Sequence, residues 1–147
     1  MAGLKRILVP TDFTETSDHA LSWAIDLAKR LGASITVMHA YEIPIVSFPD
    51  GALLATPEIA GRLADASRTA LDAAVRKHAD AGVALDSVLR EGAAWEEINA
   101  VADLIDADMV VIGTHGRRGF SRALLGSVAE NVVRTGHRPI VTIRGKE

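Results

Sequence analysis

The chain has 147 residues, which is the size of one domain, and its 48% of hydrophobic residues is enough for a full core. A formal net charge of −3 argues against a nonspecific nucleic-acid binder but leaves a small phosphorylated ligand open, and the absence of Cys excludes disulfides, thiol catalysis and thiolate metal sites. No apolar run approaches the ~20 residues of a membrane span, and no signal-type segment precedes the first strand pattern. We therefore expect a single cytoplasmic domain over residues 1–147 that spans no membrane.

Short apolar runs alternate along the chain with amphipathic stretches. The run Ile7–Val9 is typical of a strand covered on both faces. The stretch after it carries Ala20, Ala24 and Leu27 at helical spacing. The sequence predicts strands at Arg6–Pro10, Ser34–Ala40, Val83–Arg90, Met109–Ile112 and Pro139–Ile143, and helices at about Thr16–Leu31, Pro57–Ala81, Trp95–Ile105 and Ser127–Thr135.

This strand–helix alternation predicts an α/β fold with a five-stranded parallel sheet and helices on both faces. In such a doubly wound sheet a ligand binds at the carboxyl ends of the strands, where the winding direction reverses. For the strand order 3-2-1-4-5, which the sequence does not force, that point lies between the first and fourth strands. It brings Thr11 and Asp12 next to the loop Gly113–Gly116.

The segment Glu42–Thr56 does not have the composition of an ordinary solvated loop. It contains two prolines and a glycine, but also a series of Ile, Val, Phe and Leu residues. We expect so apolar a segment to fold over either the ligand cleft or a neighbouring subunit.

The stretch Gly113–Ser127 has the features of an anion site, because it joins a buried strand to the start of a helix. Its glycines have the spacing Gly-x2-Gly-x9-Gly-Ser. Glycine lets the backbone approach a phosphate, and a helix N-terminus supplies free N–H groups and partial positive charge. Neither a Walker-type phosphate loop nor a dinucleotide fingerprint after the first strand occurs in the sequence.

The sequence Gly113-x2-Gly116-x9-Gly126-Ser127, with Val128-Ala129-Glu130 after it, resembles the nucleotide-binding signature of the universal stress protein family. The opening Ile7–Asp12 and the ending Pro139–Ile143 resemble the same family. The resemblance implies the five-stranded, Rossmann-like sheet and a homodimer that pairs its final strands. It also implies ATP between the first-strand loop and the glycine loop, as in the family's ATP-binding branch.

This resemblance, together with the strand-end positions, gives a set of expected ATP contacts. The phosphates would carry Mg²⁺ or Mn²⁺, since the chain offers no dedicated carboxylate cage. No catalytic residues are predicted, because no nucleophile–base arrangement is evident, although slow hydrolysis or autophosphorylation stays open. The expected contacts are Pro10, Thr11, Asp12, Met38, Ile112, Gly113, His115, Gly116, Arg117, Gly126, Ser127 and Val128.

Several of these residues have a second interpretation that needs no ligand. By the resemblance Asp12 lies near the ribose hydroxyls or a metal, but it would also suit a turn or helix cap. Ser127 either contacts a phosphate or forms a Ser-x-x-Glu capping box with Glu130. Met38 either lies against the adenine, as the family implies, or only packs in the core.

The basic residues of the glycine loop and of the second strand also have more than one interpretation. His115 would contact phosphates through its backbone, or is an ordinary loop histidine, and His39 is expected to be a structural histidine near the cleft. Of Arg117, Arg118 and Arg122 we expect at most one to touch phosphates, the alternative being a solvated basic loop.

The function that the sequence favours is that of a small ATP-binding stress-response protein acting as a nucleotide-dependent switch or adaptor. The main alternative is a dimeric interaction protein whose role does not depend on nucleotide turnover. A third possibility, an electron-transfer flavoprotein-like or other α/β nucleotide binder, shares the fold class.

Overall fold

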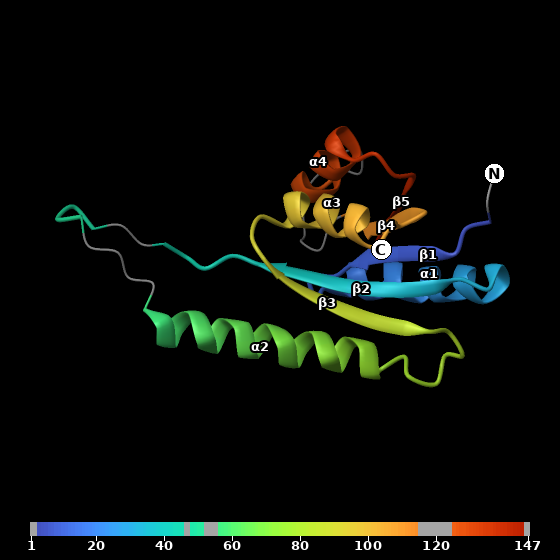
Figure 1. The fold of residues 1–147 in the computed structure, drawn as a ribbon, viewed down its shortest axis with the longest axis horizontal. Helices are drawn as coiled ribbons and strands as arrows, with labels where there is room; N and C mark the ends of the chain where they lie inside the picture. The colour runs from blue at the N-terminus through green and yellow to red at the C-terminus, as the bar shows by residue number, and fades with distance from the viewer. Residues whose placement is uncertain (1–2, 46–47, 52–55, 115–124, 146–147) are drawn as a thin grey trace.

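The computed structural model describes residues 3–45, 48–51, 56–114 and 125–145 (Figure 1). Strands and helices alternate through these residues. The elements are β1 (Arg6–Pro10), α1 (Glu15–Leu31), β2 (Ser34–Tyr41), α2 (Pro57–Arg76), β3 (Leu85–Glu91), α3 (Ala94–Leu104), β4 (Met109–Gly113), α4 (Ser127–Thr135) and β5 (Ile140–Ile143). All neighbouring strands are parallel and the order is β3-β2-β1-β4-β5, which confirms the predicted fold class and strand order.

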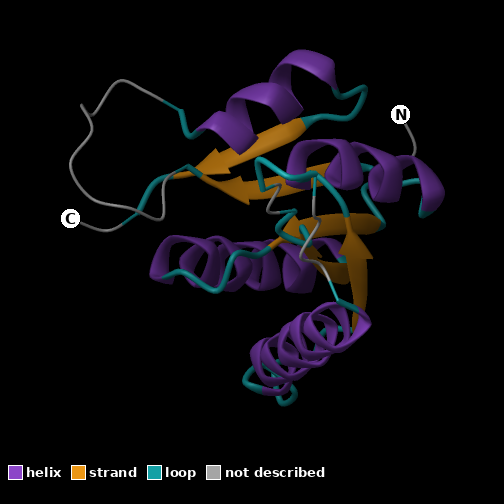
Figure 2. Cartoon of the chain, turned by 90° about the vertical axis from the view of Figure 1, so that its left-hand side faces the viewer, coloured by secondary structure: helices purple, strands orange, loops and turns teal. Residues whose placement is uncertain are grey.

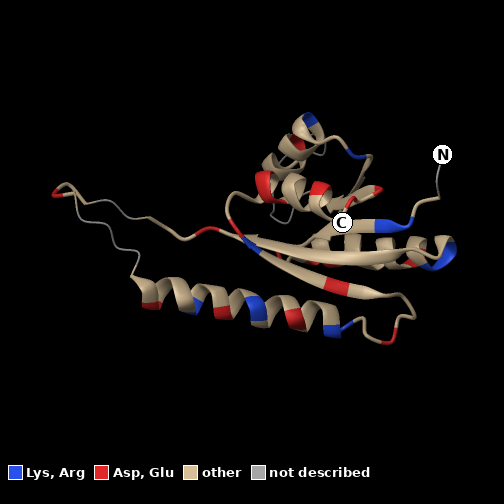
Figure 3. Cartoon of the chain, viewed as in Figure 1, with Lys and Arg blue, Asp and Glu red and all other residues tan. Residues whose placement is uncertain are grey.

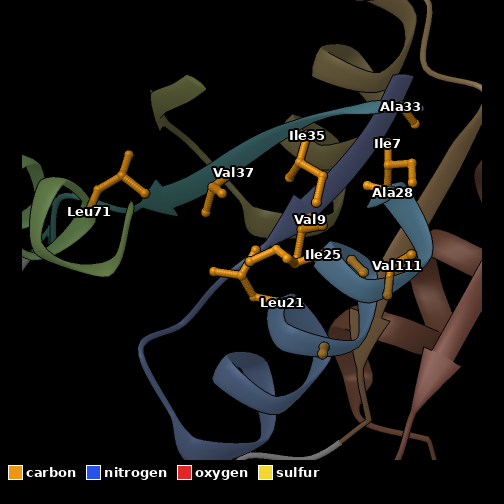
Figure 4. Packing of buried hydrophobic residues seen from close by; sticks show 12 residues of the cluster. Ile7, Val9, Leu21, Ile25, Ala28, Ala33, Ile35, Val37, Leu71 and Val111 are labelled. Atoms are coloured by element: carbon orange, nitrogen blue, oxygen red, sulfur yellow. The ribbon is translucent and has the colours of Figure 1, made fainter. Parts of the chain in front are cut away.

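The sheet has one layer of helices on each face (Figures 1 and 2). Helices α1 and α2 cover one face and α3 and α4 the other, and each layer has its own apolar cluster. Figure 4 shows the first cluster, in which Leu21 and Ile25 of α1 pack toward Val9 of β1, and Leu71 comes from α2. The central strand β1 is covered on both faces, and Ile7 and Val9 are completely buried. This burial explains the uninterrupted apolar run in the sequence.

Helix α1 begins and ends close to the predicted residues. Thr14 is its N-cap and accepts a hydrogen bond from the Ser17 amide. Gly32 follows the last turn with φ 65°, a left-handed conformation that glycine adopts without steric cost. The first turn of α1 thus starts directly after the β1 loop, so its hydroxyl side chains lie at the carboxyl edge of the sheet.

The prediction that the second helix runs to about Ala81 is wrong, since α2 ends at Arg76. Beyond it the chain makes tight turns, in which the His78 amide bonds to the Val75 carbonyl. There Lys77 Nζ donates to Asp18 of α1 at 2.9 Å, and His78 Nε2 lies 3.5 Å from the same carboxylate. The hydrogen bond from Lys77 lowers the pKa of Asp18, and the contact with His78 adds to this effect, although burial of the carboxyl opposes it. Contacts with α1 therefore accompany the end of the helix.

Other element ends differ by one or two residues from the prediction. β3 begins at Leu85 rather than Val83 and forms an edge of the sheet, as its weak pattern indicated. β5 begins at Ile140, because Pro139 has no N–H and contributes only its carbonyl, which accepts from Val110 at 2.9 Å.

The amino edge of the sheet is held by a network of charged side chains. Arg138 donates to Asp106 Oδ1 at 2.9 Å and to Asp103 Oδ1 at 3.3 Å, and Arg6 donates to Asp106 Oδ2 at 3.0 Å. Asp108 accepts from the amides of Lys5 and Arg6, and these two hydrogen bonds lower its pKa. The network ties β1, the α3–β4 turn and the entry to β5 together.

The described part of the segment after β2 leaves the body of the molecule at one end (Figure 1). Ile45 is 71% exposed and Phe48 43% exposed, and the described residues of this segment do not line the pocket at the end of β1. The expected cover over the cleft is thus not formed by these residues, and a neighbouring subunit stays a prediction.

Charged residues recur along α2 (Figure 3), and among them Arg68 pairs with Asp72 at 3.6 Å and donates to Ser87 of β3 at 3.4 Å. Within the described ranges, none of the helices combines the length and the apolar composition that crossing a bilayer requires.

Candidate nucleotide pocket

A pocket lies at the carboxyl ends of β1 and β4, where the strand order reverses. Residues from the carboxyl ends of β1, β2 and β4 meet there with residues from the starts of α1, α3 and α4. Its lining residues are Pro10, Thr11, Asp12, Thr14, Thr16, Ser17, Met38, His39, Ala40, Ala94, Ile98, Ile112, Gly113 and Val128.

The structure brings most of the sequence-predicted contacts together. Seven of them line the pocket: Pro10, Thr11, Asp12, Met38, Ile112, Gly113 and Val128. Gly126 and Ser127 lie at the start of α4 and do not line it. His115, Gly116 and Arg117 lie outside the described residues, as do Arg118 and Arg122. The roles of all these residues toward a ligand stay predictions.

Sequence reasoning missed the lining residues of α1 and α3. Thr14, Thr16 and Ser17 lie at the N-cap and in the first turn of α1, and their position just after Asp12 is the signal that could have identified them. Ala94 and Ile98 lie one helical turn apart at the start of α3. They reach the pocket because α3 packs against β2, a contact that no local pattern shows.

One side of the pocket is apolar. Met38 is completely buried, and Ile98 and Ile112 are 2% and 5% exposed. All three belong to the apolar cluster under α3 and α4. Met38 packs in the core, as one interpretation predicted, and also lines the pocket. Its contact with adenine stays a prediction. Such a wall suits a flat, weakly polar group such as a nucleotide base.

The other side of the pocket is polar and centres on Asp12. Its Oδ1 accepts from the Thr14 amide at 3.1 Å and also from the Thr14 hydroxyl. Burial opposes ionisation of the carboxyl, but hydrogen bonds from Thr14 and Ser17 outweigh it, and the pKa of Asp12 lies below its ordinary value. Asp12 is thus a turn residue at the start of α1 and, at the same time, an anionic acceptor at the pocket.

The loop before Asp12 is fixed by Thr11, which is 8% exposed. Its amide donates to the Met38 carbonyl at 2.8 Å, and its hydroxyl accepts from the Phe13 amide at 3.0 Å and bonds to Ser17 Oγ at 3.1 Å. Thr11 therefore joins β2, the loop and α1, so the polar side of the pocket has little freedom to rearrange.

The end of β2 extends past β1 and presents open backbone groups. The Ile35 amide donates to Ala84, just before β3, whereas the Met38 carbonyl accepts from the Thr11 amide on the β1 side. Because peptide groups alternate in direction along a strand, the N–H and C=O of Ala40 also point to the β1 side. Ala40 lines the pocket. Among the described residues, no backbone group of the segment that follows β1 forms a hydrogen bond with the N–H or the C=O of Ala40.

Of the two interpretations of Ser127, the capping box is wrong, and the phosphate contact stays a prediction. Gly126 occupies the N-cap position, its carbonyl accepts from the Glu130 amide at 2.8 Å, and no side chain caps the helix. Glu130 instead pairs with Arg134 at 2.6 Å. Ser127 is therefore the first helical residue, and its amide is among the N–H groups at the start of α4 that have no intrahelical partner.

The fold and pocket define a doubly wound α/β domain with a ligand site at its reversal point. The chain belongs to the universal stress protein family, whose model matches residues 3–144. It is 32% identical over 142 residues to universal stress protein MJ0531 of Methanocaldococcus jannaschii, an alignment that covers 95% of this chain and 82% of that protein.

Solved structures show the same fold. Universal stress protein UspA from Lactobacillus plantarum aligns with a TM-score of 0.81 and 23% identity, over 98% of this chain and 100% of its own. A universal stress protein in complex with cAMP aligns with a TM-score of 0.70 and 23% identity, over 99% and 100%. The one from Archaeoglobus fulgidus in complex with dAMP aligns with a TM-score of 0.65 and 20% identity, over 97% and 99%.

Proposed function

We propose that this universal stress protein binds ATP in the pocket between β1 and β4 and acts as a nucleotide-dependent switch or adaptor. The observation that carries the proposal is the arrangement of the pocket: an apolar wall, an open backbone edge at Ala40 and the anionic Asp12 meet at one reversal point. The adenine nucleotides in the similar cAMP and dAMP complexes support the choice of ligand class.

In this proposal the adenine ring lies against Met38 and Ile98. The Ala40 N–H donates to ring nitrogen N1, and the Ala40 C=O accepts from the 6-amino group, since these two base atoms are an adjacent acceptor and donor. Guanine has the opposite pattern at these positions, so the same backbone edge disfavours it.

The remaining ligand groups extend from the base toward β4 and α4. The ribose hydroxyls donate to Asp12, a strand-end carboxylate in the position that suits this contact. The phosphates lie near the backbone of Gly113 and the amides of Ser127 and Val128 at the start of α4.

Mg²⁺ or Mn²⁺ would be held mainly by the phosphate oxygens. Among the described residues, no three His, Asp or Glu side chains are grouped as a protein metal site needs. ATP and metal would therefore bind together, and metal alone only weakly.

Binding rather than fast turnover is the proposed activity, and slow hydrolysis or autophosphorylation is compatible with it. Phosphoryl transfer requires a positioned nucleophile and groups that stabilise charge on the phosphoryl oxygens. The proposal also includes a cytoplasmic location and a homodimer formed through β5.

A second candidate function is a dimeric interaction protein that does not depend on the nucleotide. It is favoured by the position of β5 at the edge of the described sheet, where Ile140, Val141 and Ile143 are only partly buried, and by the exposed Ile45 and Phe48. Partner binding that is unchanged in an ATP-free variant would support this alternative.

The binding proposal is tested by titration calorimetry of ATP with Mg²⁺ against the wild type and Asp12→Asn. Asparagine keeps an acceptor for the Thr14 amide, so the fold is preserved, but the charge at the ribose site is lost. We expect wild-type binding and an affinity about tenfold lower in the variant. Absence of wild-type binding at millimolar ATP would contradict the proposal. The switch role is tested by limited proteolysis within residues 42–56, which ATP is expected to slow.

A further inference from the structure

The backbone ladder between β1 and β2 stops one step earlier than the strands themselves require. After the Thr11 amide donates to the Met38 carbonyl at 2.8 Å, the next bond of a parallel ladder would join the Ala40 amide to the Thr11 carbonyl. That carbonyl is taken by a side chain instead: Nδ1 of His39 lies 2.7 Å from it.

The protonation of His39 follows from this contact. A carbonyl oxygen can only accept, so Nδ1 carries the proton and donates it to Thr11. The contact thus replaces a backbone N–H donor of the ladder with an imidazole N–H from the preceding residue.

The ring of His39 is held in place from the side of the loop. The Phe13 ring lies 4.3 Å from it, centroid to centroid, at an angle of 43°. Phe13 has φ 65°, an unusual conformation for a bulky residue, and its amide is tied to Thr11 Oγ1 at 3.0 Å. A phenylalanine held in this conformation keeps the imidazole against the Thr11 carbonyl.

We propose that His39 is a positioning residue which, by occupying the Thr11 carbonyl, keeps the Ala40 N–H open for the base of the ligand. The inference rests on the proposed function for the identity of that base. Without a donor at residue 39, the Thr11 carbonyl is free to accept from Ala40, the ladder closes by one more bond, and the pocket loses its donor.

Three variants separate this role from simple packing. His39→Leu removes the donor. His39→Asn keeps one, because the Asn side-chain nitrogen stands at the same number of bonds from Cβ as Nδ1. His137→Leu removes an exposed histidine between α4 and β5 and serves as the matched control. Circular dichroism and thermal melting establish that each variant is folded.

The first measurement is amide hydrogen exchange at Ala40 in the absence of nucleotide. We expect exchange to slow by about tenfold in His39→Leu, since the amide gains a backbone partner, and to stay at the wild-type rate in His39→Asn and His137→Leu. An Ala40 amide that is already protected in the wild type, or unchanged in His39→Leu, would overturn the inference.

The second measurement compares ATP with 1-deaza-ATP, in which a C–H replaces ring nitrogen N1. The wild type and His39→Asn should prefer ATP by about tenfold, the value of one hydrogen bond, and His39→Leu should lose this preference. A merely structural role would weaken both ligands equally, and an unchanged preference in His39→Leu would overturn the inference. If the wild type binds no ATP, the proposed function fails, and the exchange measurement still decides the role of His39.

Discussion

Thr16 in the first turn of α1 lies directly against Gly113 at the end of β4. A Cβ atom on Gly113 would be 2.9 Å from Thr16 Cγ2 and 3.1 Å from the Thr16 carbonyl oxygen. Thr16 also lies beside Gly145, where a Cβ would be 2.7 Å from its Oγ1. Gly113, the first glycine of the Gly-x2-Gly-x9-Gly-Ser sequence, is therefore required by the packing of α1, whether or not a phosphate binds.

Because of this contact, Gly113→Ala should destabilise the protein itself. We expect a loss of about 1–3 kcal/mol in the free energy of unfolding, measured by urea denaturation. Thr16→Ser removes Cγ2 and should recover part of the loss when combined with Gly113→Ala. If Gly113→Ala has the same unfolding midpoint as the wild type, α1 moves aside without a free-energy cost and the prediction fails. A loss of ATP binding in Gly113→Val consequently says little about phosphate contacts unless stability is measured too.

The ionised Asp12 should make stability depend on pH in a defined direction. Its pKa is lower in the folded state, so its contribution is complete above the ordinary carboxyl pKa and is lost as the pH falls through the folded-state pKa. We expect the wild type to lose stability relative to Asp12→Asn below about pH 4. Urea midpoints between pH 2 and 7 measure this, with the exposed Asp86→Asn as a control that follows the wild type. Parallel curves for wild type and Asp12→Asn would contradict the assignment.

Arg138 should anchor the entry to β5 more strongly than an ordinary surface charge. Its side chain is 25% exposed and donates to Asp103, Asp106 and the Ala107 carbonyl. We expect Arg138→Ala to lower the free energy of unfolding by about 1–2 kcal/mol and Arg138→Lys to recover little, because an ammonium group does not reproduce a guanidinium fork. Arg144→Ala, at an exposed position, is the control. Recovery by Lys would indicate that charge alone matters.

The strand–helix alternation was sufficient to predict the parallel sheet and its two helix layers, because the central strands are apolar runs of the kind that a sheet covered on both faces requires. It did not force the strand order, which the structure supplies. Features set by contacts distant in sequence were not predictable. Helix α2 ends where Lys77 and His78 reach Asp18, which for Lys77 is 59 residues away in the sequence. Similarly, the sequence could not show that Gly126 rather than Ser127 occupies the N-cap of α4.

For the pocket, too, some residues could be predicted from the sequence and others could not. Strand-end residues such as Asp12 could be placed from the sequence, since parallel strands end at one edge. Ala40 and Ile98 could not, because their place at the pocket depends on the register of β2 beyond β1 and on the packing of α3.

The proposed homodimer can be tested with a β5 variant that impairs association between chains but leaves the fold of each chain intact. The Val110 and Thr114 amides bond to the carbonyls of Pro139 and Ile143, so alternate residues of β5 face β4. The N–H and C=O of Thr142 therefore point away from β4. Thr142→Pro removes an outward N–H without removing a bond to β4. We expect it to shift the mass measured by light scattering from dimer to monomer, whereas Thr142→Ala stays dimeric. A wild-type monomer, or a Thr142→Pro dimer of unchanged stability, would mean that the chains do not associate through the edge of β5.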